Sequence, residues 1–190
     1  MAKFQLGLMK QIIAKYLHQS RRWYFCNNDL MHEKSDKLFK IRNVLNYIQN
    51  KFQTVYRPKQ ELSLDEDIIS WRGRLSSRTY NPAKLTKYEI LVRMICEATL
   101  DYICNFKIYS SAGKKLQDTI LSILHPFVGL YHHIYMDNYY HSVDTAELLL
   151  QKNTRICGTI KLHRRFPHSL KNTKLREHET KFARKGQVLL

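Results

Sequence analysis

Acidic residues are scarce in this 190-residue sequence, and long apolar runs are absent. Asp and Glu number 16 against 32 Lys and Arg, which gives a formal net charge of +16 at pH 7. This excess favours an anionic partner, with nucleic acid first and an acidic membrane surface second. A lysine-rich surface without a partner is the alternative. No apolar run approaches the ~18 residues that span a bilayer, so we expect no membrane span.

Paired cysteines are also missing. The sequence has four cysteines, none of them in a C-x-x-C pair: Cys26, Cys96, Cys104 and Cys157. We therefore expect neither a disulfide framework nor a zinc site. The last three lie in apolar stretches, where a reduced thiol behaves as a small hydrophobe. P-loops, nucleophile elbows and dinucleotide fingerprints are absent as well, so none of these enzyme signatures indicates a function.

The N-terminal stretch has no acid before Asp29, and its apolar residues predict a helix over residues 4–17. A basic, amphipathic start is typical of a mitochondrial targeting segment and also of an ordinary surface helix. Serine is scarce here and arginine occurs only at the end of the stretch, which favours the surface helix. Residues 23–36 are polar and predict a loop.

Three parts of the chain follow from composition and periodicity. The pattern of residues 1–58 predicts an N-terminal segment of two helices. The second of these helices ends before Pro58, because the residue preceding a proline avoids helical backbone. Residues 59–160 are expected to form the folded core of alternating strands and helices. Residues 161–190 predict a basic C-terminal tail, either solvated or laid as a strap against nucleic acid.

Strands and helices alternate in the predicted core. Three strands come first, at residues 62–65, 87–98 and 102–109, and predict an antiparallel meander. A helix, a strand at 132–136, a helix beginning at Asp144 and a last strand that turns at Gly158 complete the order β-β-β-α-β-α-β. This order predicts an α/β fold with a mixed sheet flanked by helices.

Two aspartates stand at or near predicted strand ends, Asp65 in the triplet Asp65-Glu66-Asp67 and Asp137 in HHIYMDNYY. Aspartate is depleted from strands, so this placement asks for a reason. Carboxylates on neighbouring strands can hold divalent metal ions, which prefer hard oxygen ligands and can drive phosphodiester cleavage. A turn, or an ion pair with Arg72 or Arg74, is the structural alternative, and the pattern alone favours it.

Four stretches, in this order, resemble the catalytic core of piggyBac-type transposases: SLDEDIISWRGRLSSRTYNPAKLTKY, ICEATLDYICNFKIYS, HHIYMDNYYHSVDTAELLL and TRICGTI. The helix KLFKIRNVLNYIQNKFQTVYRPKQ resembles the segment before that core, so the resemblance runs from about Ser35 to the C-terminus. It implies an RNase H-like mixed sheet preceded by a helical segment. It also implies a truncation before the end of the family's catalytic domain.

The resemblance implies a chemistry as well. Family members cut and rejoin DNA with three aspartates that hold two Mg²⁺ ions, and Mn²⁺ is the alternative metal. Asp65 in SLDED matches the first aspartate, and Asp137 in YMDNYY matches the second. The third is expected beyond Leu190, as is the family's cysteine-rich zinc domain. The ligand set within this sequence is therefore expected to be incomplete.

Several positions depart from the family pattern. Glu89 stands where the family usually has glycine, and Ser77 replaces a common aromatic residue. Leu100 and Asp101 replace a glycine-containing turn, where leucine would poorly tolerate a positive φ. Together these departures indicate relaxed constraint or a new role.

We therefore predict a transposase-derived DNA-binding protein of the nucleus, catalytically inactive because the third aspartate is missing. The expected phosphate contacts are Arg72, Arg74, Arg78, Lys84, Lys87, Arg164 and Arg165. A remnant that is non-functional or only binds partners is the first alternative, and a residual metal-dependent DNA nuclease is the second. A homodimer, an assembly with related transposases, and a mitochondrial location stay open.

Overall fold

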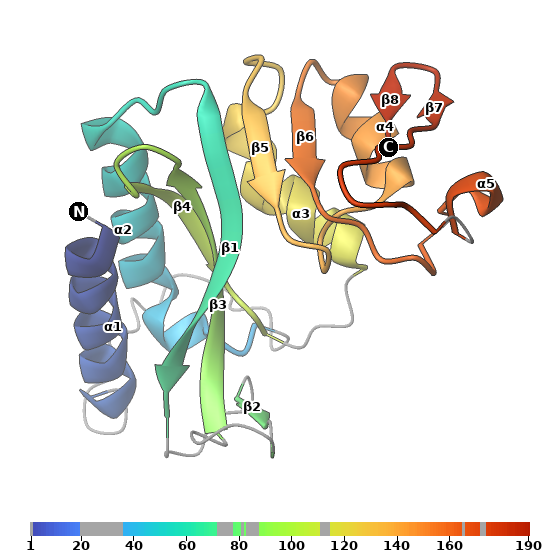
Figure 1. The fold of residues 1–190 in the computed structure, drawn as a ribbon. Coiled ribbons are helices and arrows are strands. Elements are labelled where there is room, and N and C mark those ends of the chain that lie inside the picture. The colour runs from blue at the N-terminus through green and yellow to red at the C-terminus, as the bar shows by residue number, and fades with distance from the viewer. Residues whose placement is uncertain are drawn as a thin grey trace.

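A computed structural model gives the fold, in which one sheet carries helices on both of its faces (Figure 1). It describes residues 2–19, 36–71, 78–80, 82, 88–110, 115–164, 166–171 and 174–190. The helices are α1 (Ala2–Gln19), η1 (Phe39–Ile41), α2 (Arg42–Val55), α3 (Leu116–Leu124), η2 (His125–Phe127), α4 (Val143–Leu150) and α5 (His168–Lys171). The strands are β1 (Glu61–Ser70), β2 (Thr79–Tyr80), β3 (Tyr88–Glu97), β4 (Ile103–Ile108), β5 (His133–Met136), β6 (Arg155–Gly158), β7 (Arg184–Lys185) and β8 (Val188–Leu189).

The main sheet combines both strand directions. β1 pairs antiparallel with β3 on one side and parallel with β5 on the other, and β6 continues the parallel half beside β5. β2 and β4 both pair antiparallel with β3. The helix crossover through α3 thus returns the chain to the far side of β1, and the predicted mixed sheet is confirmed.

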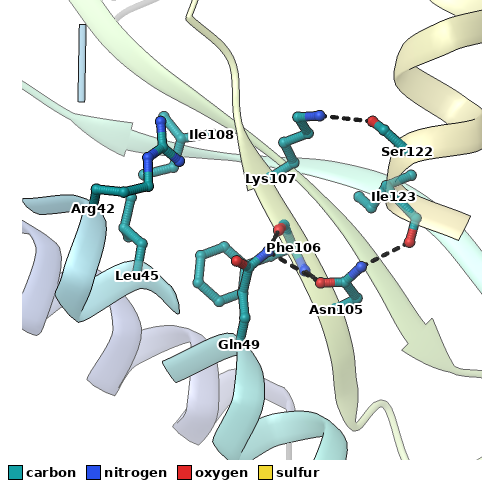
Figure 2. A pocket seen from close by; sticks show the side chains of 9 residues that line it. All are labelled: Arg42, Leu45, Gln49, Asn105, Phe106, Lys107, Ile108, Ser122 and Ile123. Carbon is teal, nitrogen blue, oxygen red and sulfur yellow. Dashed lines mark hydrogen bonds between the residues drawn. The ribbon is translucent and has the colours of Figure 1, made fainter. Parts of the chain in front are cut away.

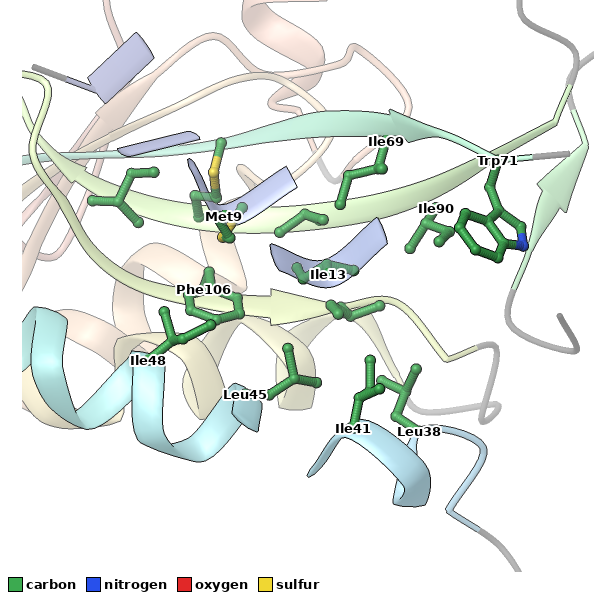
Figure 3. Packing of buried hydrophobic residues seen from close by; sticks show 14 residues of the cluster. Met9, Ile13, Leu38, Ile41, Leu45, Ile48, Ile69, Trp71, Ile90 and Phe106 are labelled. Carbon is green, nitrogen blue, oxygen red and sulfur yellow. The ribbon is translucent and has the colours of Figure 1, made fainter. Parts of the chain in front are cut away.

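The first core lies where α1 and α2 cover β3, β4 and the end of β1 (Figure 3). Met9 and Ile13 from α1 are each 1% exposed and pack in the same cluster as Ile90 of β3. Leu45 and Ile48 on the apolar stripe of α2 complete the contact. The N-terminal helices and the sheet therefore share one core across the predicted boundary at residue 58.

The second core lies on the opposite face of β1, under α3 and α4. Leu62 and Leu64 of β1 point there, whereas Ile69 joins the first core, because strand residues alternate between faces. Ile134 of β5 and Leu149 of α4 are fully buried in this second cluster. β1 thus contributes to both cores, at different points along its length.

Some local expectations differ from the structure. The helix expected to begin at Asp144 is capped by Ser142, whose hydroxyl accepts a hydrogen bond from the Thr145 N–H at 3.1 Å. Cys157, expected to be buried, is exposed because it lies on the outermost strand, β6. The predicted loop at residues 23–36 lies outside the described residues apart from Asp36.

The predicted C-terminal tail contains ordered elements. α5 follows the sheet, and β7 and β8 form an antiparallel hairpin. Lys185 of this hairpin forms a salt bridge of 2.9 Å with Glu147 of α4, which lays the hairpin against that helix. None of the described helices is long and apolar enough to span a bilayer.

Candidate metal site

Asp65 lies in the middle of β1, not at a strand end as expected, and Asp137 directly follows the last residue of the neighbouring strand β5. In the parallel pairing of β1 with β5, Leu64 stands opposite Met136. The next residue on each chain is the predicted aspartate. Leu64 and Met136 are both buried in the second core, whereas both aspartates are exposed, so their carboxylates share the opposite face of the sheet. Residues far apart in the sequence thus meet at one position of the sheet.

The backbone around Asp137 is fixed by hydrogen bonds. The Asp137 carbonyl accepts from the N–H groups of Tyr140 and His141, at 3.0 and 3.1 Å. The Asp137 carboxylate lies 3.5 Å from the Thr159 hydroxyl, which follows β6. Asp65 accepts the N–H of Glu66 at 2.8 Å. The Asp65 carboxylate is thus bonded to backbone and the Asp137 carboxylate to a side-chain hydroxyl, and both side chains are exposed to solvent.

A glycine makes the close pairing beside Asp137 possible. Gly158 of β6 stands opposite Met136 of β5. A Cβ at Gly158 would lie 1.9 Å from the Met136 carbonyl oxygen. Sequence reasoning placed a turn at this glycine and missed the close approach, because a lone glycine in a strand pattern indicates either.

The third acid of the triplet, Asp67, forms an ion pair with a lysine. Asp67 shares a face of β1 with Asp65, and Lys10 of α1 places its Nζ 2.7 Å from Asp67 Oδ2. This positive charge compensates the Asp67 carboxylate, so we assign the site to Asp65 and Asp137. No group of three or more His, Cys, Asp and Glu side chains gathers into a metal site within the described part of the chain.

The donor set fits a hard divalent cation. Mg²⁺ uses one or two protein carboxylates and keeps several water ligands, which matches two exposed aspartates on rigid strands. A bound ion of this kind would polarise phosphate oxygens and lower the pKa of a bound water. Two carboxylates supply hard oxygen donors, the kind that Mg²⁺ and Mn²⁺ prefer.

The predicted DNA contacts are only partly visible. Arg72, Arg74, Lys84, Lys87 and Arg165 lie outside the described residues. Arg78 places its guanidinium 3.9 Å from the ring centre of Tyr88, at the β2–β3 end of the sheet. Arg164 donates to the carbonyls of Tyr139 and His141, at 2.5 and 3.3 Å. Arg164 thus supports the turn after Asp137, a role that sequence reasoning did not foresee.

A separate hollow of about 210 Å³ lies between α2, β4 and α3 (Figure 2). Its polar side chains bind other protein groups. Arg42 pairs with Asp36 at 2.6 Å, and Lys107 Nζ donates to the Ser122 hydroxyl at 2.7 Å. We therefore treat this hollow as a structural junction and assign it no ligand.

Comparisons with known proteins agree with this geometry. A family model described as Transposase IS4 matches residues 11–190. Among solved structures, the chain is similar to the piggyBac transposase in a cryo-EM structure of its synaptic complex with hairpin DNA. The TM-score is 0.76 and the sequence identity 26%, over 82% of this chain and 35% of that chain. The sheet is therefore RNase H-like, and this chain, which covers about a third of that transposase, belongs to the IS4 transposase family in its piggyBac-type branch.

Proposed function

We propose that this transposase-derived chain binds DNA and holds a divalent metal ion between Asp65 and Asp137. The register that places Leu64 opposite Met136 carries the metal part of the proposal, because it brings both carboxylates to one face. The net charge of +16 supports a polyanionic partner. The similar piggyBac structure holds hairpin DNA, which supports DNA as that partner. A nuclear location would follow from this partner.

The two carboxylates support metal binding better than cleavage. Phosphodiester cleavage by the two-metal route needs ligands that stabilise both the attacking and the leaving oxygen. Asp65 and Asp137 together supply ligands for one metal ion, and the Asp67 carboxylate is paired with Lys10. We infer that the 190-residue chain, assayed alone, binds DNA without cutting it.

DNA binding is tested by its dependence on salt. Fluorescence anisotropy with a labelled duplex should give a logarithm of the affinity that falls linearly with the logarithm of NaCl concentration. Arg78→Ala should weaken binding for every sequence and reduce the slope by about one. Lys51→Ala, which removes the same charge from α2, serves as the control and should change the slope less. A slope near zero for the parent protein would rule out phosphate-driven binding.

The metal site is tested separately by thermal unfolding. Mn²⁺ should raise the melting temperature of the parent protein and leave Asp65→Asn unmoved, because a ligand that binds only the folded state stabilises it. Equal shifts in both proteins would place the ion elsewhere. Nicking of supercoiled DNA by the parent, lost in Asp65→Asn, would instead establish the nuclease alternative.

A further inference from the structure

A chain of hydrogen-bonded polar side chains connects β1, β3 and the turn after Asp137. Glu66 and Arg93 stand directly opposite each other in the β1–β3 pairing. The Tyr140 hydroxyl lies between them: it donates to the Glu66 carboxylate and accepts from Arg93 Nε at 3.2 Å. Tyr140 is 2% exposed and Arg93 is 6% exposed, whereas Glu66 forms the exposed end of this chain of bonds.

Each member of this chain is held by its neighbours. Burial, followed by the hydrogen bond and charge of Glu66, raises the pKa of Tyr140, so the hydroxyl keeps its proton and remains a donor. The Arg93 guanidinium also lies 5.1 Å from the ring centre of Tyr109. Hydrogen bonds to charged groups are stronger than neutral ones, and the two buried members, Tyr140 and Arg93, would carry a desolvation cost if they were left unpaired.

Tyr140 belongs to the same turn as Asp137. Its N–H donates to the Asp137 carbonyl at 3.0 Å, while its hydroxyl reaches Glu66 on β1. Glu66 follows Asp65 and faces the opposite side of the sheet. The Tyr140 side chain therefore connects the strand that carries one carboxylate to the turn that carries the other. Arg164 holds this turn from a second side through the carbonyls of Tyr139 and His141.

We propose that Tyr140 is a positioning residue for the metal site: its hydroxyl, held between Glu66 and Arg93, sets the place of Asp137 beside Asp65. This inference rests on the proposed metal binding at these two aspartates. Removing the hydroxyl keeps the ring and both aspartate side chains, but it should free the turn that carries Asp137 to move away from Asp65. Groups that support metal ligands in this way change metal affinity by about 10- to 100-fold when they are removed.

The test compares the Mn²⁺ affinity of three folded proteins by isothermal titration calorimetry, well below their melting temperatures. Tyr140→Phe should bind Mn²⁺ about tenfold more weakly than the parent. Tyr102→Phe is the matched control, because Tyr102 is also buried in the second core and donates its hydroxyl to the Phe52 carbonyl at 3.1 Å. It should lose stability while it keeps the parent's Mn²⁺ affinity.

The outcomes separate the two proposals. Parent-like Mn²⁺ affinity in Tyr140→Phe, with binding that still requires Asp65, overturns the positioning role alone. Binding by the parent that Asp65→Asn leaves unchanged overturns both proposals. If Tyr140→Phe does not fold, Arg93→Lys decides the question, because it keeps the charge and removes the Nε donor. Its Mn²⁺ affinity should fall in the same direction, and an unchanged value overturns the inference.

Discussion

At residue 158 the backbone of β6 approaches β5 so closely that only a hydrogen fits. A Cβ there would lie 1.9 Å from the Met136 carbonyl oxygen. Gly158→Ala must push the two strands apart, so we expect it to lower the free energy of unfolding by about 1–3 kcal/mol. Denaturant unfolding followed by circular dichroism measures the change.

Gly7 provides the control for this prediction. It lies in α1, and a Cβ added there would meet no atom within 4 Å. Alanine loses less backbone entropy than glycine in a helix, so Gly7→Ala should raise stability by about 0.5–1 kcal/mol. The same chemical change should thus have opposite signs at the two glycines. Parent-like stability of Gly158→Ala would contradict the pairing of Gly158 with Met136.

The candidate site shows how far single residues can be predicted from the sequence. Asp65 and Asp137 were chosen from a family motif, and strand register then placed them together. The pair Tyr139-Tyr140 favours core or edge packing over base stacking, but the sequence does not show which partner the Tyr140 hydroxyl binds. Tyr140 is in fact buried, whereas Tyr139 is 40% exposed. Such contacts depend on the register in which β5 pairs with β1. That register cannot be predicted from the local sequence pattern.

At the scale of elements, β4 shows how an edge strand is protected. β4 pairs only with β3 among the described strands, so its outer backbone groups need other partners. Gln5 of α1 accepts the Ile103 N–H at 3.0 Å, and Gln49 of α2 donates to the Phe106 carbonyl at 2.6 Å. Both helices that cover this face therefore also close its edge.

Asn105 of β4 ties the same edge to α3 (Figure 2). It is 5% exposed, donates to the Ile123 carbonyl at 2.8 Å and accepts from Gln49 Nε2 at 3.2 Å. Asn105→Leu leaves the Ile123 carbonyl without this buried donor and removes one of the two acceptors of Gln49 Nε2, so we expect a loss of about 1–3 kcal/mol in the free energy of unfolding. Chemical denaturation of the single and double variants with Gln49→Leu measures it.

The double-mutant cycle gives this prediction its control. Asn105 and Gln49 share one hydrogen bond, so their effects on stability should differ from additivity by at least about 0.5 kcal/mol. Gln53→Leu, on the same helix α2, serves as the comparison and should add to Asn105→Leu without coupling. Additive effects for Asn105 and Gln49 would mean that the bond between their amides contributes nothing.

The elements themselves were largely predictable, and their ends were not. Periodicity found α2 and the strand order, because each element buries one stripe or face. The positive φ expected of the turn at Leu100 and Asp101 falls on Asp101, at 55°, where aspartate is better tolerated than leucine. The β7–β8 hairpin was missed because two-residue strands show no alternation, and its salt bridge to α4 joins residues distant in sequence.

At the scale of the whole molecule, β1 couples two cores on opposite faces. Ile69 belongs to the cluster under α1 and α2, and Leu64 to the cluster under α3 and α4. The sequence predicts a helical segment at residues 1–58 ahead of the core. Burial joins the helices of this segment to the sheet, so α1, α2 and the sheet should unfold together.

Ile13 of α1 tests this coupling. It is 1% exposed and packs in the first core (Figure 3), so Ile13→Ala should cost about 2–5 kcal/mol. Loss of far-UV circular dichroism and exposure of the Cys104 thiol to a labelling reagent should follow the same denaturant curve. Cys104 is a sensitive probe of the second core, because burial raises the pKa of its thiol to about 12 and keeps it unreactive while folded.

Leu8 on the same helix supplies the matched control for this experiment. It is 47% exposed, so Leu8→Ala should change the stability by no more than about 0.5 kcal/mol. An early, separate loss of helix signal in Ile13→Ala, with Cys104 still protected, would show that α1 unfolds independently of the sheet. A single shifted transition seen by both probes would instead show that α1 is part of the unit that carries Asp65 and Asp137, since β1 belongs to both cores.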